Sequence, residues 1–225
     1  MWNLAPMDKP TPAATDRTAE FFHRYARDFD AIYGTRNTFL NRLINAFLRR
    51  SIKLRYEETL KGCDPITGKS VLDVGCGPGH YAVALARRGA AQILGLDFAP
   101  EMLELARARA EAAGVASRCR FELGDFLTYP LNEAFDYAVV MGFMDYVRDP
   151  DAVIAKVLQA TKSKAFFSFP AAGGLLAWQR RLRYRQRCEL FLYSPSDLNQ
   201  LFGAIGDRWQ LKRLARDYFV TVYSK

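Results

Sequence analysis

The residues best suited to chemistry lie around a glycine-rich turn. A hydrophobic run, V-L-D-V at residues 71–74, leads directly into G-C-G-P-G at residues 75–79. Glycines let a backbone adopt unusual angles and let a ligand approach it closely, and a helix starting after the turn would offer N–H groups to an anion. Asp97 follows about 20 residues later, where a carboxylate can accept both hydroxyls of an adenosine ribose. We therefore expect a nucleoside-containing ligand here.

The spacing of the glycines distinguishes between classes of nucleotide site. A dinucleotide fingerprint, G-x-G-x-x-G, would need a third glycine at position 80, which is His80. The spacing here is G-x-G-x-G with Asp73 two residues ahead of it. It resembles the first motif, D/E-x-G-x-G-x-G, of the class I S-adenosylmethionine-dependent methyltransferases. The resemblance extends from about Phe21 to the C-terminus and implies S-adenosylmethionine as cofactor and methyl transfer as the reaction.

The resemblance also implies contacts to the cofactor. Asp97 corresponds to the acid that binds the ribose, and Asp125 to the acid that accepts from the adenine amino group. A backbone carbonyl near Met141 or Gly142 corresponds to the one that meets the methionine amino group. Taken singly, these residues also have structural interpretations. Asp125 could form a turn, and Phe98 and Met102 could belong to the core. The expected cofactor-binding residues are Asp73, Gly75, Cys76, Gly77, Gly79, Asp97, Phe98, Met102, Asp125, Phe126 and Met141.

The segment M-G-F-M-D-Y-V at residues 141–147 bears on the methyl acceptor. It lacks the N/D-P-P-Y/F motif of enzymes that methylate amino groups, and the chain has no Pro-Cys pair of the cytosine C5 type. It is similar to the quinone-type and porphyrin-type small-molecule methyltransferases, in which a His or Glu often stands at the position of Asp145. We therefore expect a small-molecule acceptor with an O, S or C nucleophile and Asp145 as catalytic base, or else Asp145 as a helix cap.

The N-terminal part also resembles these enzymes. Their leading segment F-x-x-x-A-x-x-Y-D is similar to residues 22–30, although Phe29 stands where the tyrosine is expected. A hydroxyl contact near the substrate must then come from elsewhere, and Tyr25 and Tyr33 are the candidates.

The net charge of +8 is concentrated in one part of the chain. Between Asp151 and Glu189 there are eight basic residues and no acidic one, so the rest of the chain is neutral. The arginines at 180–187, with Arg183 and Arg185 as candidate substrate contacts, could bind an acidic substrate or form a solvated basic helix. A nucleic-acid or membrane contact is disfavoured because the leading helices show no matching charge. The alternative function is a non-catalytic S-adenosylmethionine-binding or nucleic-acid-docking protein.

The elements that must position these residues alternate between strands and helices. Apolar strands separated by helical segments predict parallel strands with crossover helices, whereas the last two runs are too close together for a crossover and predict a hairpin. Two helices, at 15–33 and 37–60, come first. The remaining elements are expected at 70–74, 81–88, 92–96, 100–113, 120–123, 135–141, 151–160, 164–169, 209–214 and 218–223.

These elements predict one α/β domain with a doubly wound, mostly parallel seven-stranded sheet. We expect a flexible leader at 1–15 and a single domain at 16–225. Within that domain we expect a helical lid at 16–62, a Rossmann-like core at 68–225 and a substrate-cover insertion at 171–193. No run is long enough for a transmembrane helix.

The cysteines and histidines bear on metals and location. The four cysteines lack any C-x-x-C pair and predict free thiols and a cytoplasmic protein, and the two distant histidines give no reason to expect a metal. Oligomeric state cannot be read from the sequence.

Overall fold

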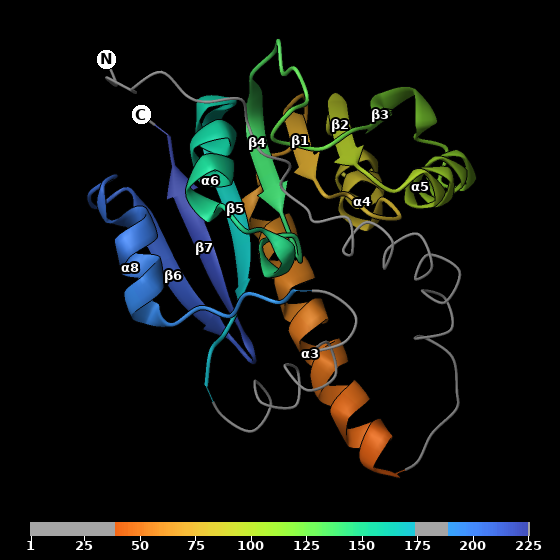
Figure 1. Ribbon diagram of the computed structural model, residues 1–225. Coiled ribbons are helices and arrows are strands. Elements are labelled where there is room, and N and C mark those ends of the chain that lie inside the picture. The colour runs from red at the N-terminus through yellow and green to blue at the C-terminus, as the bar shows by residue number, and fades with distance from the viewer. Residues whose placement is uncertain (1–38, 174–188, 225) are drawn as a thin grey trace.

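The computed structural model describes residues 39–173 and 189–224. A seven-stranded sheet runs through them in the order β3-β2-β1-β4-β5-β7-β6 (Figure 1). All neighbouring strands are parallel except β7, which is antiparallel to both β5 and β6. The strands are β1 (Ser70–Val74), β2 (Gln92–Asp97), β3 (Cys119–Leu123), β4 (Phe135–Val140), β5 (Thr161–Pro170), β6 (Trp209–Leu214) and β7 (Asp217–Tyr223).

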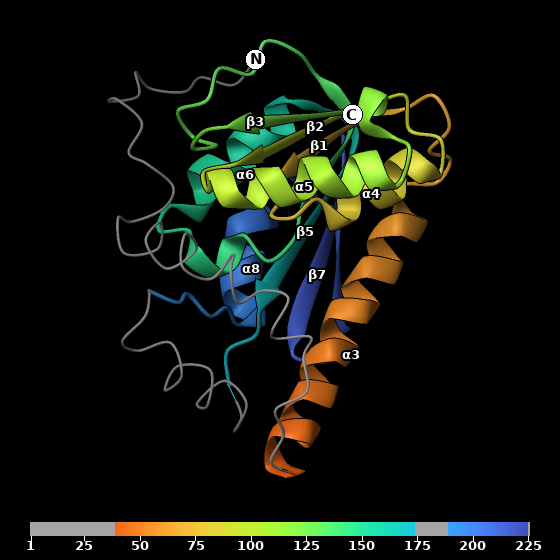
Figure 2. The ribbon, with the colours of Figure 1, turned by 90° about the vertical axis from the view of Figure 1, so that its right-hand side faces the viewer.

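Helices cover both faces of the sheet, because crossover connections place a helix against each face. On one face, α3 (Phe39–Gly62), α4 (His80–Arg87) and α5 (Pro100–Ala112) pack over one hydrophobic core. On the other, α6 (Pro150–Gln159) and α8 (Pro195–Gly203) pack over a second core that is rich in phenylalanine. Figures 1 and 2 show both layers, and α3 projecting beyond the sheet at its N-terminal end. Two short 3₁₀ helices are η1 (Ala116–Arg118) and η2 (Met144–Tyr146).

The chain order of the strands reverses beside β1. From β1 the chain adds β2 and then β3 on one side, and it later returns to place β4 and β5 on the other. In open α/β sheets, ligands bind outside the carboxyl ends of the strands at such a switch point. The turns that follow β1 and β4 therefore border the expected site.

The fold agrees closely with the expectation from sequence. The doubly wound sheet and the terminal hairpin, whose strands are joined by Ala215 and Arg216, are both confirmed. Strand β5 is longer than the expected 164–169, since its first residues at 161–163 are more polar than the apolar run that follows them. Helix α8 was not expected. The expected helix at 15–33 lies outside the described residues.

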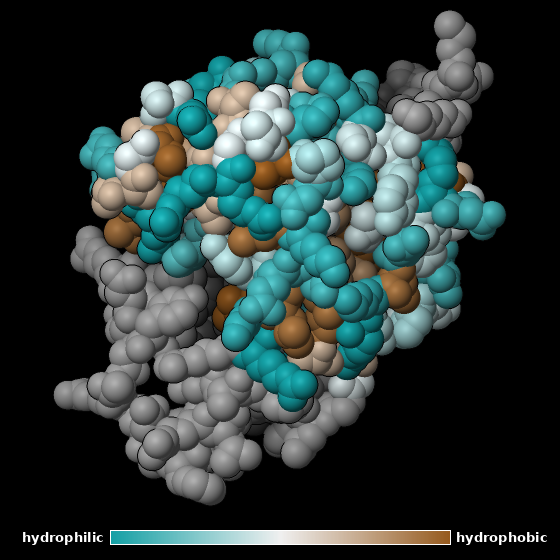
Figure 3. All heavy atoms as spheres, turned by 180° about the vertical axis from the view of Figure 1, so that it is seen from behind, coloured by the Kyte–Doolittle hydropathy of each residue, from teal (hydrophilic) through white to brown (hydrophobic). Residues whose placement is uncertain are grey.

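The face seen in Figure 3, behind that of Figure 1, is largely hydrophilic, with apolar side chains gathered in patches. Among the described helices, none is long and apolar enough to cross a membrane.

Candidate active site

The glycine turn between β1 and α4 has one open side. Gly75, Gly77 and Gly79 all have positive φ angles, of 64°, 50° and 74°. A Cβ at Gly75 would lie 2.5 Å from Cδ2 of Phe143, and one at Gly79 would lie 2.9 Å from the Cβ of Ala106, whereas a Cβ at Gly77 would meet nothing within 4 Å. Two glycines therefore let protein groups pack closely, and the third exposes backbone to a ligand.

Asp97 closes this turn from the end of β2. Its Oδ2 accepts from the Gly77 N–H at 2.8 Å, and its Oδ1 accepts from the Ala99 N–H at 2.9 Å. Burial raises the pKa of the carboxyl, and these backbone N–H groups act in the opposite direction. Each carboxylate oxygen has a second lone pair, so both can still accept from a pair of ligand hydroxyls.

Asp73, in β1, is a buried carboxyl group with an unsatisfied oxygen. It is 1% exposed, and its Oδ2 has no hydrogen-bond partner. Burial is the main reason that its pKa rises to about 7; the backbone N–H of Ala82 lowers it, and the charge of Asp97 raises it further. A buried acceptor without a donor is uncommon, and a cationic ligand group beside it would supply the missing partner. The site therefore fits a ligand that carries both a diol and an ammonium group.

The residues expected around the adenine lie beyond the ends of β2 and β3. Phe98 is half-buried and Met102 is buried. Asp125 is half-buried, and its Oδ1 accepts from the Leu127 N–H at 2.9 Å, so it does form the turn that the sequence left as an alternative. Phe126 is buried in the core beneath α6. Their roles toward a cofactor stay predictions.

The turn after β4 brings in a residue that the sequence analysis missed. Met141 is buried and Gly142 has a φ of 70°. The next residue, Phe143, packs against Gly75, and its ring meets Phe126 edge-on at a centroid distance of 6.4 Å. An aromatic residue after M-G gives no signal of this contact, because its partners are distant in sequence. Phe143 thus connects the turns after β1 and β4.

Asp145 lies inside η2 and is only 3% exposed. Its backbone carbonyl accepts from the Phe191 N–H at 2.9 Å, and the Tyr193 hydroxyl donates to the neighbouring carbonyl of Met144 at 3.3 Å. The start of η2 has no side-chain cap, and Asp149 caps α6 by accepting from the Ala152 N–H. Phe143 occupies the N-cap position of η2, Asp145 lies in its first turn, and the role of Asp145 as a base stays a prediction.

Other expected site residues cannot be placed. Tyr25, Tyr33, Arg183 and Arg185 lie outside the described residues. Cys76 is buried within the glycine turn, and the three cysteines in the described part of the chain are free. In that same part, no three His, Cys, Asp or Glu side chains gather in a way that could hold a metal.

Comparison with known proteins shows the family to which the chain belongs. A family described as a methyltransferase domain matches residues 71–164, which contain the glycine turn, Asp97 and Asp125. The chain is also 31% identical over 164 residues to the magnesium-protoporphyrin O-methyltransferase of Rhodobacter capsulatus, covering 70% of this chain and 71% of that one. The chain belongs to the S-adenosylmethionine-dependent methyltransferases. Membership confirms the expected family, activity class and cofactor.

This methyltransferase is also similar to a ubiquinone biosynthesis enzyme and to a second magnesium-protoporphyrin enzyme. It is 38% identical over 115 residues to a ubiquinone biosynthesis O-methyltransferase of Neisseria meningitidis, a match that spans about half of each chain (48% and 47%). Its fold is similar to that of magnesium protoporphyrin IX methyltransferase from Synechocystis, solved with bound SAH, with a TM-score of 0.71, 17% identity and coverage of 92% and 98%. The same Synechocystis protein with bound SAM gives a TM-score of 0.69 at 19% identity, covering 96% of this chain and 100% of that one.

Proposed function

We propose that this methyltransferase passes the methyl group of S-adenosylmethionine to a carboxylate oxygen of a porphyrin-class acceptor. The observation that carries the proposal is the match to the magnesium-protoporphyrin enzyme, which extends over 70% of this chain. The matches to the ubiquinone enzymes cover about half of it. The oxygens of a protoporphyrin belong to carboxyl groups, so O-methylation of that ring system forms a methyl ester.

Different residues of the described part of the chain would bind different parts of the donor. Asp97 accepts from the ribose hydroxyls, and Asp73 supplies the carboxylate that faces the donor's ammonium group, together with the Met141 carbonyl. The glycines at 75, 77 and 79, with Cys76 between them, provide a backbone wall. The bound donor supplies an activated sulfonium methyl. Phe98, Met102, Asp125 and Phe126 form the adenine side of the proposed site.

A carboxylate acceptor would make a catalytic base at Asp145 unnecessary. A carboxyl group is ionised at neutral pH, so the methyl acceptor needs no base and alignment supplies the acceleration. Asp145, which is 3% exposed, has no proton to take from such an acceptor. The second candidate acceptor is a phenol oxygen of a quinone precursor, which the ubiquinone relatives favour. A phenol must lose its proton, and in that case Asp145 is the proposed base.

We also propose how the acceptor is covered. A lid at 16–62, which includes α3, and an insertion at 171–193 would enclose the acceptor as parts of a single domain at 16–225. Tyr25, Tyr33, Arg183 and Arg185 would contact the acceptor, with the arginines binding its acidic groups. A cytoplasmic location is part of the proposal, supported by the free thiols of Cys63, Cys76 and Cys119. The comparisons do not favour the non-catalytic or nucleic-acid-docking alternative.

The test is transfer of radiolabelled methyl groups from S-adenosylmethionine to magnesium protoporphyrin, with a polyprenyl catechol as competing acceptor. We expect label in the porphyrin, released by mild alkaline hydrolysis as an ester should be. Asp97→Ala should transfer little label, and Asp207→Ala, which replaces an exposed aspartate, should match the wild type. Label in the catechol alone would contradict the porphyrin acceptor and favour the second candidate, the phenol oxygen. Label that stays in the donor would contradict both candidate acceptors.

A further inference from the structure

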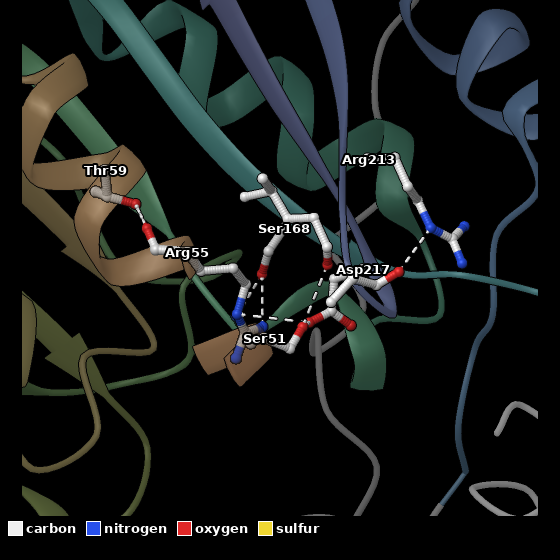
Figure 4. Close-up of polar contacts among 9 residues, drawn as sticks. Ser51, Arg55, Thr59, Ser168, Arg213 and Asp217 are labelled. Carbon is white, nitrogen blue, oxygen red and sulfur yellow. Dashed lines mark hydrogen bonds and ion pairs between the residues drawn. The ribbon is translucent and has the colours of Figure 1, made fainter. Parts of the chain in front are cut away.

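Polar side chains from three elements meet in one cluster (Figure 4). Ser51 and Arg55 come from α3, Ser168 from β5 and Asp217 from the start of β7. Both serines are buried, and the side chains of Arg55 and Asp217 are only 13% and 5% exposed. A buried anionic side chain and a largely buried cationic one therefore lie together between α3 and the C-terminal hairpin.

Hydrogen bonds connect this cluster to the turn after β4. Asp217 Oδ2 accepts from Ser51 Oγ at 2.6 Å and lies 3.6 Å from Arg55 Nε. Arg55 Nη1 donates to Ser168 Oγ at 3.1 Å, and Ser168 Oγ also accepts from the Gly142 N–H at 2.8 Å. The contacts thus run from β7 through α3 and β5 to Gly142, which borders the proposed donor site.

Stability alone is a weak explanation for such a cluster. Removing two charges from water costs free energy, and replacing a buried ion pair by apolar side chains is often neutral or stabilising. The position of the guanidinium is more informative. A Cβ at Gly142 would have only Nη1 and Nη2 of Arg55 within 4 Å, at 3.8 and 4.0 Å. The guanidinium of Arg55 therefore lies on the side of Gly142 where a Cβ would stand, and Ser168 accepts from the Gly142 N–H.

We propose that Ser168 and Asp217 are positioning residues for methyl transfer. Asp217 holds the guanidinium of Arg55, and Ser168, which accepts from both Arg55 and Gly142, holds the turn at 141–143 in the conformation that binds the methionine end of the donor. Because Arg55 lies on α3, docking of this helix and binding of the donor are coupled. The inference rests on the proposed function, in which this turn contacts the donor.

The test uses Ser168→Ala, with Ser163→Ala as its matched control. Ser163 lies in the same strand, is half-buried, and belongs to the opposite end of β5. Loss of the Ser168 hydroxyl leaves the Gly142 N–H and an Arg55 N–H without their acceptor, so the dissociation constant for S-adenosylhomocysteine should rise about tenfold. Ser163→Ala should change it less than about twofold.

A second variant tests the connection through Arg55. Asp217→Asn keeps the shape of the side chain but removes its charge, and it should weaken donor binding about threefold to tenfold. Combined with Ser168→Ala, its effect should be smaller than the product of the two single effects, because both act through one guanidinium. It also keeps the inference testable if Ser168→Ala does not fold.

Calorimetry well below the melting temperature separates positioning from a purely structural role. A structural role would lower the melting temperature of Ser168→Ala and Asp217→Asn and leave the donor dissociation constant unchanged, and that result would overturn the inference. Weakened donor binding in both folded variants supports it. Failure of methyl transfer to a porphyrin, with these affinity changes intact, would remove the proposed acceptor and leave the positioning roles standing.

Discussion

Asparagine at position 73 should change the pH dependence of folding and weaken donor binding. Asp73 is buried in β1 with an unsatisfied Oδ2, and burial raises its pKa from 3.8 to about 7. The folded state therefore binds this proton more tightly than the unfolded chain does. The stabilisation that Asp73 contributes is complete below pH 3.8 and is lost as the pH rises through about 7.

The magnitude follows from the size of that shift. At about 1.4 kcal/mol per pKa unit, the full range amounts to about 4 kcal/mol. Between pH 5 and pH 8 the free energy of unfolding of the wild type should fall by about 2 to 3 kcal/mol relative to Asp73→Asn. The absolute stability of the variant is a separate matter, because its amide N–H₂ is buried where Oδ2 was. The change with pH is therefore the quantity to compare.

Urea unfolding followed by tryptophan fluorescence in steps of one pH unit from pH 3 to pH 8 measures this difference. Asp136→Asn is the control of opposite sign, since the backbone N–H of Ser70 holds the pKa of Asp136 below its ordinary value. In that case the wild type should lose stability relative to the variant as the pH falls through the acid range. Parallel pH profiles for wild type and Asp73→Asn would refute the burial argument for Asp73.

Two further predictions concern the chemical step and the acceptor. If the acceptor is a phenol, Asp145→Asn should lower turnover by about 10² with the donor dissociation constant unchanged, and a near-normal pH profile of turnover would leave alignment as the mechanism. If the basic segment binds an acidic acceptor, neutralising Arg183 and Arg185 together should raise the Michaelis constant for that acceptor well beyond any change in donor affinity. Unchanged steady-state kinetics in this double variant would indicate that the arginines form a solvated surface and do not bind the acceptor.

The parts that sequence predicts well are those with local causes. Strands β1, β2 and β4 are apolar runs, and the glycines after β1 are required by positive φ angles. The start of helix α8 also has a local signal in the sequence, because Ser194 and Asp197 form a capping box and Pro195 occupies the first turn.

The parts that sequence cannot predict depend on contacts between distant residues. Ser51 and Asp217 are 166 positions apart and still share a hydrogen bond. Asp145 follows β4, as its position in the chain indicates, but its burial is set by residues near 191–193, which pack on η2. A pattern of residue types carries no information about such partners until the sheet order is known.

The most direct test of the central claim is a calorimetric titration of the wild type and Asp97→Ala with S-adenosylhomocysteine, and of the wild type with NAD. Asp97 anchors the glycine turn and is the proposed acceptor for both ribose hydroxyls. Donor product should bind the wild type, Asp97→Ala should bind it more weakly by roughly 2 to 4 kcal/mol, and NAD should give no binding heat. Tight binding of NAD with no response to the donor product would contradict the account.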